Sequence, residues 1–503
     1  MKRQNILILS LLLIFSSCME NEMYDKINPE IFPMNSEDAL TLVNAAYDPF
    51  GPQGKTMFHV AGGYITESEM VTDYADISWG WDIRYNSYEA NSWCMDYEWR
   101  RIYDRFRDLS SMTLNIDRIS SVEMDAKLKA RYIGEIKCAR GFLAFMLYDM
   151  YGPVVIADLE TLKNPFESET LPRATEEEMQ NYIETSLKEA ADVLPYKYPS
   201  SEYGRFTKGL ANTVLLKLYM MTGRWDDAEK MGRELMDPQY GYKLEPDYNL
   251  LFSLAGEGNA EIIYAVPCAE GVAEHEWFAH VLTTDYPTPE GMNITKWNGF
   301  KMTWPQYESF DPKDKRRERI IGEYTGTDGT VHNRKNDRDS GQQGLLYWGA
   351  IPLKYKIEGT KGQFSEVDLV IYRYADVLTL LSEAIVRKGN AVTQEAVDLM
   401  NQVRVTHGGL EPYQMSDFAN VDDFLDKMLV ERGHEFWWEG VRRQDLLRHG
   451  KFIEYAVKKA EFAGQPTGKI TTQVDGKYKY ERFPIPPMYI TEGQGVIKQN
   501  PGF

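Results

Sequence analysis

Cysteine is scarce in this sequence, with four residues in a chain of 503. They are Cys18, Cys94, Cys138 and Cys268, and no two of them form a C-x-x-C pair. This wide spacing excludes the dense disulfide framework of small secreted domains and the paired spacing of a structural zinc site. We therefore predict neither a disulfide framework nor a metal site.

An excess of positive charge is also missing. The sequence has 56 Lys and Arg residues against 76 Asp and Glu residues, which gives a formal net charge of −20. A chain of this charge repels phosphate backbones, so a nucleic-acid partner is excluded. Anionic membrane surfaces are disfavoured for the same reason.

No hydrophobic run is long enough to cross a bilayer, which takes about 20 apolar residues. The strongest run is residues 6–15, and because Lys2 and Arg3 precede it, the arrangement is typical of a signal peptide. Two serines and Cys18 follow directly, and they resemble the lipobox of bacterial lipoproteins. We expect residues 1–17 to be removed and Cys18 to carry the lipid anchor. The alternative is an ordinary cleavage site beside an incidental cysteine.

The rest of the chain is longer than one ordinary core usually accommodates. We predict an N-terminal region with helical repeats over 18–237. A C-terminal region over 238–503 is predicted to contain a loop insertion, residues 238–370, followed by closing helices. Long irregular stretches over 64–97, 238–370 and 461–503 are expected to be functional rather than connective.

Helical periodicity is clear in several segments. Apolar residues recur three, four or seven positions apart up to Gly152-Pro153, which predicts a helical hairpin over 98–151. In residues 210–236, Gly223 and Ala228 have the offsets of the turn and the helix crossing in a tetratricopeptide repeat.

Three further segments extend this pattern. A looser second copy of the repeat runs from Tyr374 through Gly389 to Val403, and residues 174–194 and 421–447 add more helical runs. The predicted fold class is therefore mostly α, with tetratricopeptide-repeat-like helical pairs forming a superhelical scaffold and large irregular loops inserted into it.

Short strings follow one another in a fixed order behind Cys18. They are Arg140-Gly141-Phe142, Tyr151-Gly152-Pro153-Val154, Arg373-Tyr374-Ala375-Asp376-Val377-Leu378, Ser382-Glu383-Ala384, the pairs Glu431-Arg432, Glu435-Phe436 and Glu439-Gly440 with Arg442, Asp445 and Leu446, Phe483-Pro484-Ile485-Pro486, and Gln499-Asn500-Pro501-Gly502-Phe503. Together they resemble the SusD/RagB family, the lipoprotein partners of TonB-dependent transporters. Each string is weak alone, but their joint order is specific.

The spacing of the glutamates within these strings indicates architecture. Glu431, Glu435 and Glu439 recur every four residues beside arginines, so we expect them on one helical segment. Gly433-His434 and His449 depart from the family pattern, and we expect them to be scaffold changes that leave substrate choice untouched.

The resemblance implies a SusD-like α/α fold and a role without catalysis or cofactor. It implies that the protein captures an oligosaccharide and delivers it to a SusC-like TonB-dependent transporter, with the helical repeats as the docking side. The lipid on Cys18 would attach it to the outer membrane, and the acidic residues 19–22 resemble a tag that directs such lipoproteins to the cell exterior.

Aromatic residues are unusually plentiful, with 11 Trp, 32 Tyr and 21 Phe. Sugar rings have an apolar C–H face and a rim of hydroxyls, so exposed aromatic rings beside polar side chains on irregular loops suit them. The resemblance to the family implies that sugar-stacking aromatic residues lie on two loop regions, which correspond roughly to two of these irregular stretches. The candidates for glycan stacking are Trp79, Trp81, Tyr85, Trp297, Trp304 and Tyr307. The alternative for each ring is packing of its loop onto the helices.

No catalytic constellation stands out. His275 and His280 superficially resemble a zinc-protease pair, but they are five positions apart instead of four, so a structural or surface role is favoured. Asp and Glu are too numerous for sequence to select an acid and a nucleophile. We therefore assign no catalytic residue. A peptide-binding RagB-like lipoprotein, a surface glycoside hydrolase and a repeat scaffold without a ligand remain as alternatives.

Overall fold

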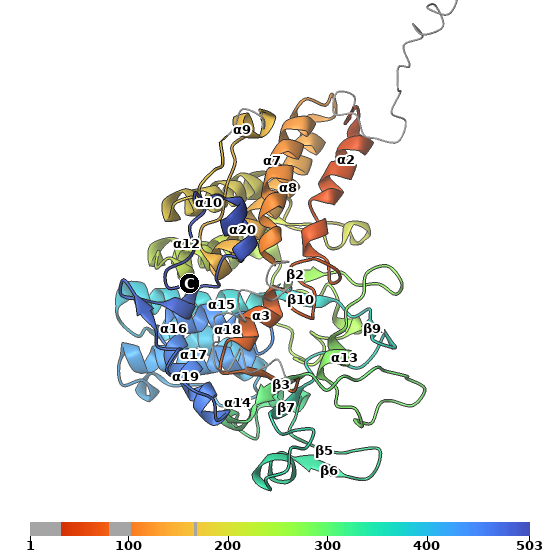
Figure 1. Cartoon of the computed structure of the whole chain (residues 1–503), viewed down its shortest axis with the longest axis vertical. Helices are drawn as coiled ribbons and strands as arrows, with labels where there is room; N and C mark the ends of the chain where they lie inside the picture. Colours follow the sequence, from red (N-terminus) through yellow and green to blue (C-terminus); the bar gives the residue numbers. More distant parts are fainter. Residues whose placement is uncertain (1–31, 80–101, 165–168) are drawn as a thin grey trace, which may run out of the picture.

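The computed structural model describes residues 32–79, 102–164 and 169–503. It is mostly helical, with small sheets gathered on one side of the helices (Figure 1), so the predicted fold class is confirmed. The longer helices are α2 (Ser36–Ala45), α7 (Phe106–Ser120), α8 (Ala126–Tyr151), α10 (Glu176–Val193), α11 (Lys208–Met221), α12 (Trp225–Leu235), α15 (Tyr374–Gly389), α16 (Gln394–Thr406), α17 (Val421–Glu435) and α19 (Phe452–Phe462). The shorter ones are α3 (Tyr64–Met70), α9 (Leu159–Lys163), α13 (Trp277–Val281), α14 (Trp304–Ser309), α18 (Arg442–Arg448) and α20 (Pro487–Glu492).

Neighbouring helices of the repeat pack against one another in the order α7, α8, α10, α11, α12, α15 and α16. Their starts are fixed locally, because side chains of Asp125, Thr175, Thr207 and Thr393 accept hydrogen bonds from the first free backbone amides. At Thr175 the Glu178 side chain returns the bond and completes a capping box. Capping fixes the individual helices, and their packing in this order, including α12 against α15 across the insertion, produces the predicted superhelix.

The turn between α11 and α12 has the predicted repeat geometry. Gly223 adopts a left-handed φ of 72°, and the Arg224 amide donates to the Tyr219 carbonyl at 2.9 Å. Ala228 is completely buried at the crossing. In the second copy the helix ends one residue later than expected, because Asn390, with φ 46°, takes the left-handed position instead of Gly389.

The structure contains strands that the sequence did not predict, and most of them lie in the insertion. A four-stranded sheet has the order β1 (Ala75–Ile77), β3 (Phe300–Thr303), β7 (Gly349–Pro352) and β4 (Ile320–Ile321). Antiparallel pairs are formed by β2 (Ile262–Val266) with β10 (Leu369–Arg373), β5 (Glu323–Thr325) with β6 (Val331–Asn333), β8 (Thr360–Lys361) with β9 (Phe364–Ser365), and β11 (Gln473–Val474) with β12 (Lys477–Tyr478). Strand β10 leads directly into α15, so the insertion returns to the helices without a linker.

Buried ion pairs fasten the insertion to the helices. Arg373 lies at the junction of β10 and α15, and its guanidinium donates to Glu261 at 2.9 Å, to Glu435 at 2.5 Å and to Glu439 at 2.7 Å. Arg316 joins Glu435 from the other side at 3.1 Å. Removing one partner of such a buried pair costs about 3–5 kcal/mol, because the other charge stays buried and unpaired.

The family glutamates are not all on one helix, so this expectation is wrong. Helix α17 ends at Glu435, and the chain turns through Trp438 (φ 58°) and Gly440 (φ 76°) before α18 begins. The turn lets Glu439 reach Arg373 and Lys354, which a continued helix would not permit. The predicted architectural role of these residues agrees with their contacts.

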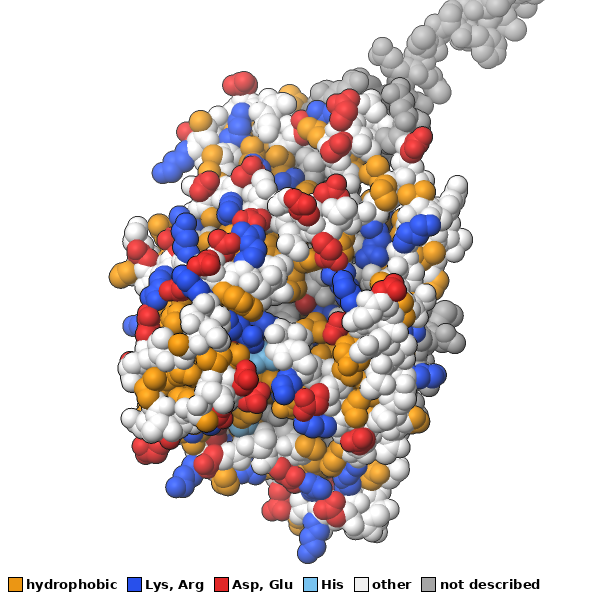
Figure 2. All heavy atoms as spheres, turned by 90° about the vertical axis from the view of Figure 1, so that its left-hand side faces the viewer, with side chains coloured by type: hydrophobic (Ala, Val, Ile, Leu, Met, Phe, Trp, Pro, Cys, Tyr) orange, Lys and Arg blue, Asp and Glu red, His pale blue; other side chains and the backbone are white. Residues whose placement is uncertain are grey.

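Charges on the surface are mixed. On the face formed by α16, α17 and α19, basic and acidic side chains of the described residues are interspersed (Figure 2). Among the described residues, no helix is both long and apolar enough to cross a membrane. Cys18 and the predicted signal peptide lie outside the described residues.

Candidate functional site

The β1–β3 strand pair brings the two predicted aromatic regions together. Ala75 pairs with Met302 and Ile77 with Phe300 in antiparallel register. The residues that follow β1 therefore lie beside those that precede β3, and the residues before β1 lie beside those after β3. Each end of this strand pair carries a candidate binding surface.

Trp79 and Trp297 meet at the first end. The Trp79 indole Nε1 donates to the Trp297 carbonyl at 2.9 Å, and both rings are half-buried. His280 packs edge-on against both, with ring centroids 5.6 Å from Trp79 and 4.8 Å from Trp297. We call Trp79 and Trp297 the tryptophan pair. It combines partly exposed apolar rings with a fixed geometry, as a saccharide-stacking surface requires.

His280 supports the tryptophan pair as a neutral ring. Burial lowers the pKa of His280 to about 4, and its Nδ1 lies 2.8 Å from the Glu276 carbonyl, so Nδ1 carries the proton and donates. Burial also lowers the pKa of His275 to about 4, and its Nε2 lies 2.8 Å from the Val367 carbonyl. Both histidines therefore have structural roles, as predicted.

The other stacking candidates differ in their surroundings. Trp304 is 2% exposed and its Nε1 donates to the Leu346 carbonyl at 3.0 Å, so the expectation of an exposed ring is wrong there. Its position at the start of α14, directly behind β3, turns the ring into the core. Tyr307 is half-buried, with the Arg317 guanidinium 4.4 Å above its ring. Trp81 and Tyr85 lie outside the described residues.

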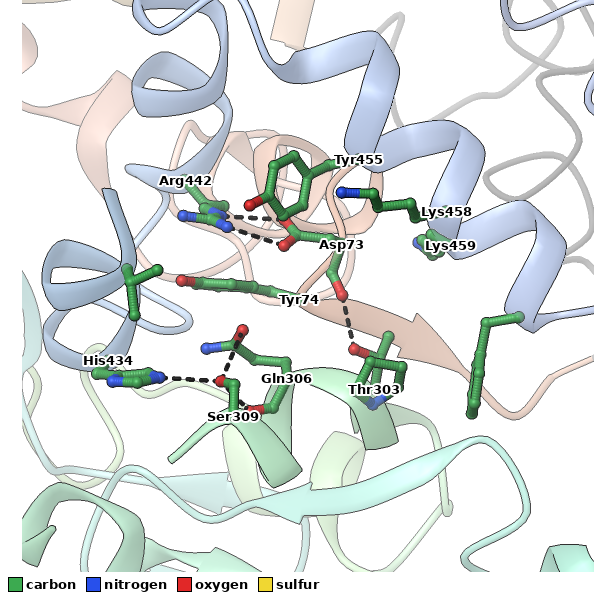
Figure 3. A pocket seen from close by; sticks show the side chains of 13 residues that line it. Asp73, Tyr74, Thr303, Gln306, Ser309, His434, Arg442, Tyr455, Lys458 and Lys459 are labelled. Atoms are coloured by element: carbon green, nitrogen blue, oxygen red, sulfur yellow. Dashed lines mark hydrogen bonds and ion pairs between the residues drawn. The ribbon is translucent and has the colours of Figure 1, made fainter. Parts of the chain in front are cut away.

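A cavity of about 200 Å³ lies at the second end of the strand pair (Figure 3). Segments from four parts of the chain line it: Asp73, Tyr74, Thr303, Pro305, Gln306, Ser309, Val430, His434, Arg442, Tyr455, Lys458, Lys459 and Phe462. It is smaller than the usual 300–1,000 Å³ of drug-sized ligand sites, so it suits a single small polar group.

Asp73 and Arg442 form one wall of the cavity. Their two hydrogen bonds, at 3.0 and 2.8 Å, make a bidentate ion pair, and the guanidinium lies 4.1 Å above the Tyr74 ring. Figure 3 shows this ring between the ion pair and the opposite wall. Arg442 occupies both carboxylate oxygens of Asp73, so this carboxylate is not free to act as an acid or base.

Ser309, Gln306 and His434 form the opposite wall. The Ser309 hydroxyl lies 2.9 Å from His434 Nε2, and burial with nearby Arg316 and Arg442 holds the pKa of His434 well below its ordinary value. His434 is therefore neutral, and because the Ser309 hydroxyl donates to the Gln306 carbonyl at 2.7 Å, the imidazole carries its proton on Nε2 and donates to the Ser309 oxygen. Gln306 is 7% exposed, and its Nε2 has no hydrogen-bond partner among the described residues, so it offers a donor to the cavity.

One departure from the family pattern, His434, lines this cavity, and Gly433 beside it packs against Tyr74 of the lining. A side chain at Gly433 would overlap the Tyr74 hydroxyl, and the His434 ring stacks on Phe310 with centroids 4.1 Å apart. His434 is thus part of the cavity wall, and the expectation that Gly433-His434 is a scaffold change that leaves substrate choice untouched stays a prediction. The unusual residues at these two positions were the available sequence signal.

One buried cluster resembles a metal site. Ligand atoms of Glu261, His407 and Glu435 lie within 4.8 Å of one another. Burial lowers the pKa of His407, but the carboxylates of Glu435 and Glu261 outweigh it and raise the pKa to about 9. Arg373 contacts Glu261 at 2.9 Å and Glu435 at 2.5 Å, so the protonated His407 and Arg373 together balance the two glutamates in a buried ion-pair network.

The fold is that of a helical-repeat protein with a strand-containing insertion. Two family models match the chain: one described as "Starch-binding associating with outer membrane" over residues 25–220, and one described as "SusD family" over residues 260–503. The chain belongs to the SusD/RagB family, as the sequence strings predicted.

Relatives and solved structures agree with this assignment. The chain is 24% identical to "SusD-like protein P38" of Formosa agariphila over 90% of this chain and 93% of that protein. It resembles a SusD homolog from Bacteroides thetaiotaomicron with a TM-score of 0.73, at 21% identity over 94% and 98% of the two chains. Surface glycan-binding protein A of the same organism, in complex with laminarihexaose, matches with a TM-score of 0.69 at 20% identity over 93% of this chain and all of that one.

Proposed function

We propose that this protein captures an oligosaccharide at the cell surface and passes it to a SusC-like TonB-dependent transporter. The observation that carries the proposal is the tryptophan pair, because Trp79 and Trp297 come from segments far apart in sequence and are fixed side by side with partly exposed rings. The structural neighbour in complex with laminarihexaose supports a carbohydrate ligand.

We also propose that the protein binds without cutting. Glycoside hydrolysis ordinarily needs two carboxyl groups across the bond, one as acid and one as nucleophile or base. Asp73 is the acidic residue in the lining of the cavity, and its carboxylate is occupied by Arg442. The Ser309–His434 pair does not substitute for the carboxylates, because none of the described residues in the cavity lining places a carboxylate beside His434 to orient its ring.

The anchor and the partner complete the proposal. Cys18 would be acylated after residues 1–17 are removed, which attaches the protein to the outer membrane with its binding surfaces facing the exterior. The helical repeats would face the transporter. The family description, which names association with the outer membrane, supports this location.

Calorimetric titration tests the binding surface. The mature protein is titrated with neutral oligosaccharides, and the variants Trp79→Ala and Trp297→Ala are expected to weaken binding by about 1–3 kcal/mol, the range for an aromatic stacking platform or interface anchor. Trp225→Ala is the matched control, because this half-buried tryptophan lies on α12, outside both surfaces.

Product analysis separates the alternatives. Chromatography of the glycan after incubation should show no cleavage; cleavage would favour the hydrolase. Binding of peptides but of no oligosaccharide would favour the RagB-like alternative, and binding of neither would favour a scaffold. Unchanged glycan affinity in both tryptophan variants would place the binding surface elsewhere.

A further inference from the structure

A second aromatic surface lies away from the β1–β3 strand pair. A groove of about 560 Å³ is bordered by the α10–α11 connection, by residues 240–242 and by strand β2. Four of its tyrosines are partly exposed: Tyr196, Tyr198, Tyr203 and Tyr242. Figure 1 shows β2 near the foot of α8, well separated from β3. We call this surface the tyrosine groove.

Tyr203 is the most exposed of these rings and is nevertheless held in place. It is 45% exposed, while its hydroxyl donates to Asp368 at 2.5 Å. A Cβ on Gly258 would lie 3.3 Å from the ring, so the ring rests on this glycine. The hydrogen bond and the packing together fix an exposed aromatic face, which lowers the entropy that a ligand must remove on binding.

The remaining rings are fixed by one another and by cations. Tyr240 and Tyr242 stack with centroids 5.6 Å apart and planes at 22°, and Tyr196 meets Tyr240 edge-on at 4.8 Å. Arg131 lies 5.3 Å from the centre of the Tyr198 ring. The groove is therefore a rigid arrangement of aromatic walls rather than a set of loose surface side chains.

Two charged residues of the groove, Glu202 and Arg205, are already held in ion pairs. Glu202 contacts Arg131 at 2.8 Å and Arg205 at 3.1 Å, and Arg205 also contacts Glu135 at 2.9 Å. A charged ligand group placed against Glu202 or Arg205 would have to break these pairs. A neutral ligand with hydroxyl groups would use their outer lone pairs and N–H groups without breaking them.

The volume of the groove and the chemistry of its lining residues favour one class of ligand. The volume falls within the 300–1,000 Å³ typical of small-molecule sites. Aromatic faces suit the C–H faces of sugar rings, and Glu257 and Asn259 add polar groups for the hydroxyl rims. Burial and the Asp368 carboxylate raise the pKa of Glu257 to about 7, which keeps a donor available near neutral pH.

We propose that the tyrosine groove is a second carbohydrate site, which holds a short neutral oligosaccharide segment independently of the tryptophan pair. The proposal rests on the proposed function in taking the ligand to be a carbohydrate, but it uses different residues. One molecule would then engage a long glycan at two places and gain avidity wherever the chain spans both.

Titration of the mature protein with neutral hexasaccharides of glucose, xylose, mannose and galactose tests the groove. The wild type is expected to bind two equivalents of its preferred hexasaccharide. A Trp79→Ala/Trp297→Ala double variant should retain one of them, and Tyr203→Ala added to it should weaken that remaining site about tenfold or more. Tyr203→Phe keeps the ring and should lose less.

Tyr413→Ala is the matched control, because this half-buried tyrosine lies outside both surfaces. Melting curves of all variants exclude unfolding as the cause of lost binding. If the wild type binds one equivalent and Tyr203→Ala does not weaken it, the groove is not a carbohydrate site, whereas the proposed function still stands. If Tyr203→Ala abolishes binding and the double tryptophan variant keeps it, the groove is a carbohydrate site and the tryptophan pair is not. A wild type that binds none of the hexasaccharides overturns both.

Discussion

His407 gives the most direct test of the buried ion-pair network. Its side chain is completely buried, with Nδ1 2.7 Å from Glu435 and Nε2 3.1 Å from Glu261. Since the two carboxylates raise its pKa to about 9 despite burial, the imidazolium is a structural cation at neutral pH. His407→Gln removes this charge and keeps a hydrogen-bonding side chain.

The sign of the pH dependence follows from the two pKa values. In the unfolded chain the pKa of histidine is about 6.5, below the folded value of about 9. Protonation of His407 therefore contributes stability that is fully present below about pH 6.5 and is lost as the pH rises through about 9. The gap between the two pKa values corresponds to about 3 kcal/mol of unfolding free energy.

Urea unfolding of the wild type and of His407→Gln measures this contribution. The variant should be less stable by about 3 kcal/mol near pH 6, and the difference should shrink toward pH 9. Taking the difference between the two proteins at each pH removes the contributions of the other titrating groups to the free energy of unfolding. His449→Gln is the control of opposite sign: burial lowers the pKa of His449, so the wild type loses stability relative to this variant as the pH falls below about 6.5. A His407→Gln difference that is the same at every pH would refute the charged state of His407.

Three further changes test the anchor, the repeat and the core. Cys18→Ala should release the protein from outer membranes and leave its melting curve unchanged, because the acyl chains supply the anchor and the core supplies the fold; fractionation without the transporter measures this. Gly223→Val should destabilise the protein by about 1–2 kcal/mol, because its φ of 72° is left-handed, and an unchanged melting midpoint would contradict the repeat turn. Trp304→Ala should cost about 3–5 kcal/mol of stability without affecting ligand affinity, which thermal melting and titration of the folded protein check together.

The elements that the sequence predicted well are those fixed by their own neighbours. The α7–α8 hairpin and the α11–α12 turn depend on apolar spacing, caps and Gly223, all of which lie within a few turns of one another. The end of α17 depends instead on the ion pairs of Glu439 with Arg373 and Lys354. Both partners lie more than 60 positions earlier in the sequence. No local pattern contains that information.

The candidate site likewise combines features that depend on local sequence with features that depend on distant contacts. Residue type and loop context were enough to select Trp79 and Trp297, but their contact exists only because β1 pairs with β3. The same pairing buries Trp304, which begins the helix directly after β3. Sequence gave no means of distinguishing the exposed rings from the buried one, because the strand partners are distant in the chain.

The β1–β3 pairing also sets the order in which binding competence arises. Trp79 and the carbonyl of Trp297 that it contacts are 218 positions apart, so the tryptophan pair forms only after a very long loop has closed. Most of the helices between them form from local contacts and are complete earlier. A chain interrupted before residue 300 would lack β3 and would therefore have no tryptophan pair.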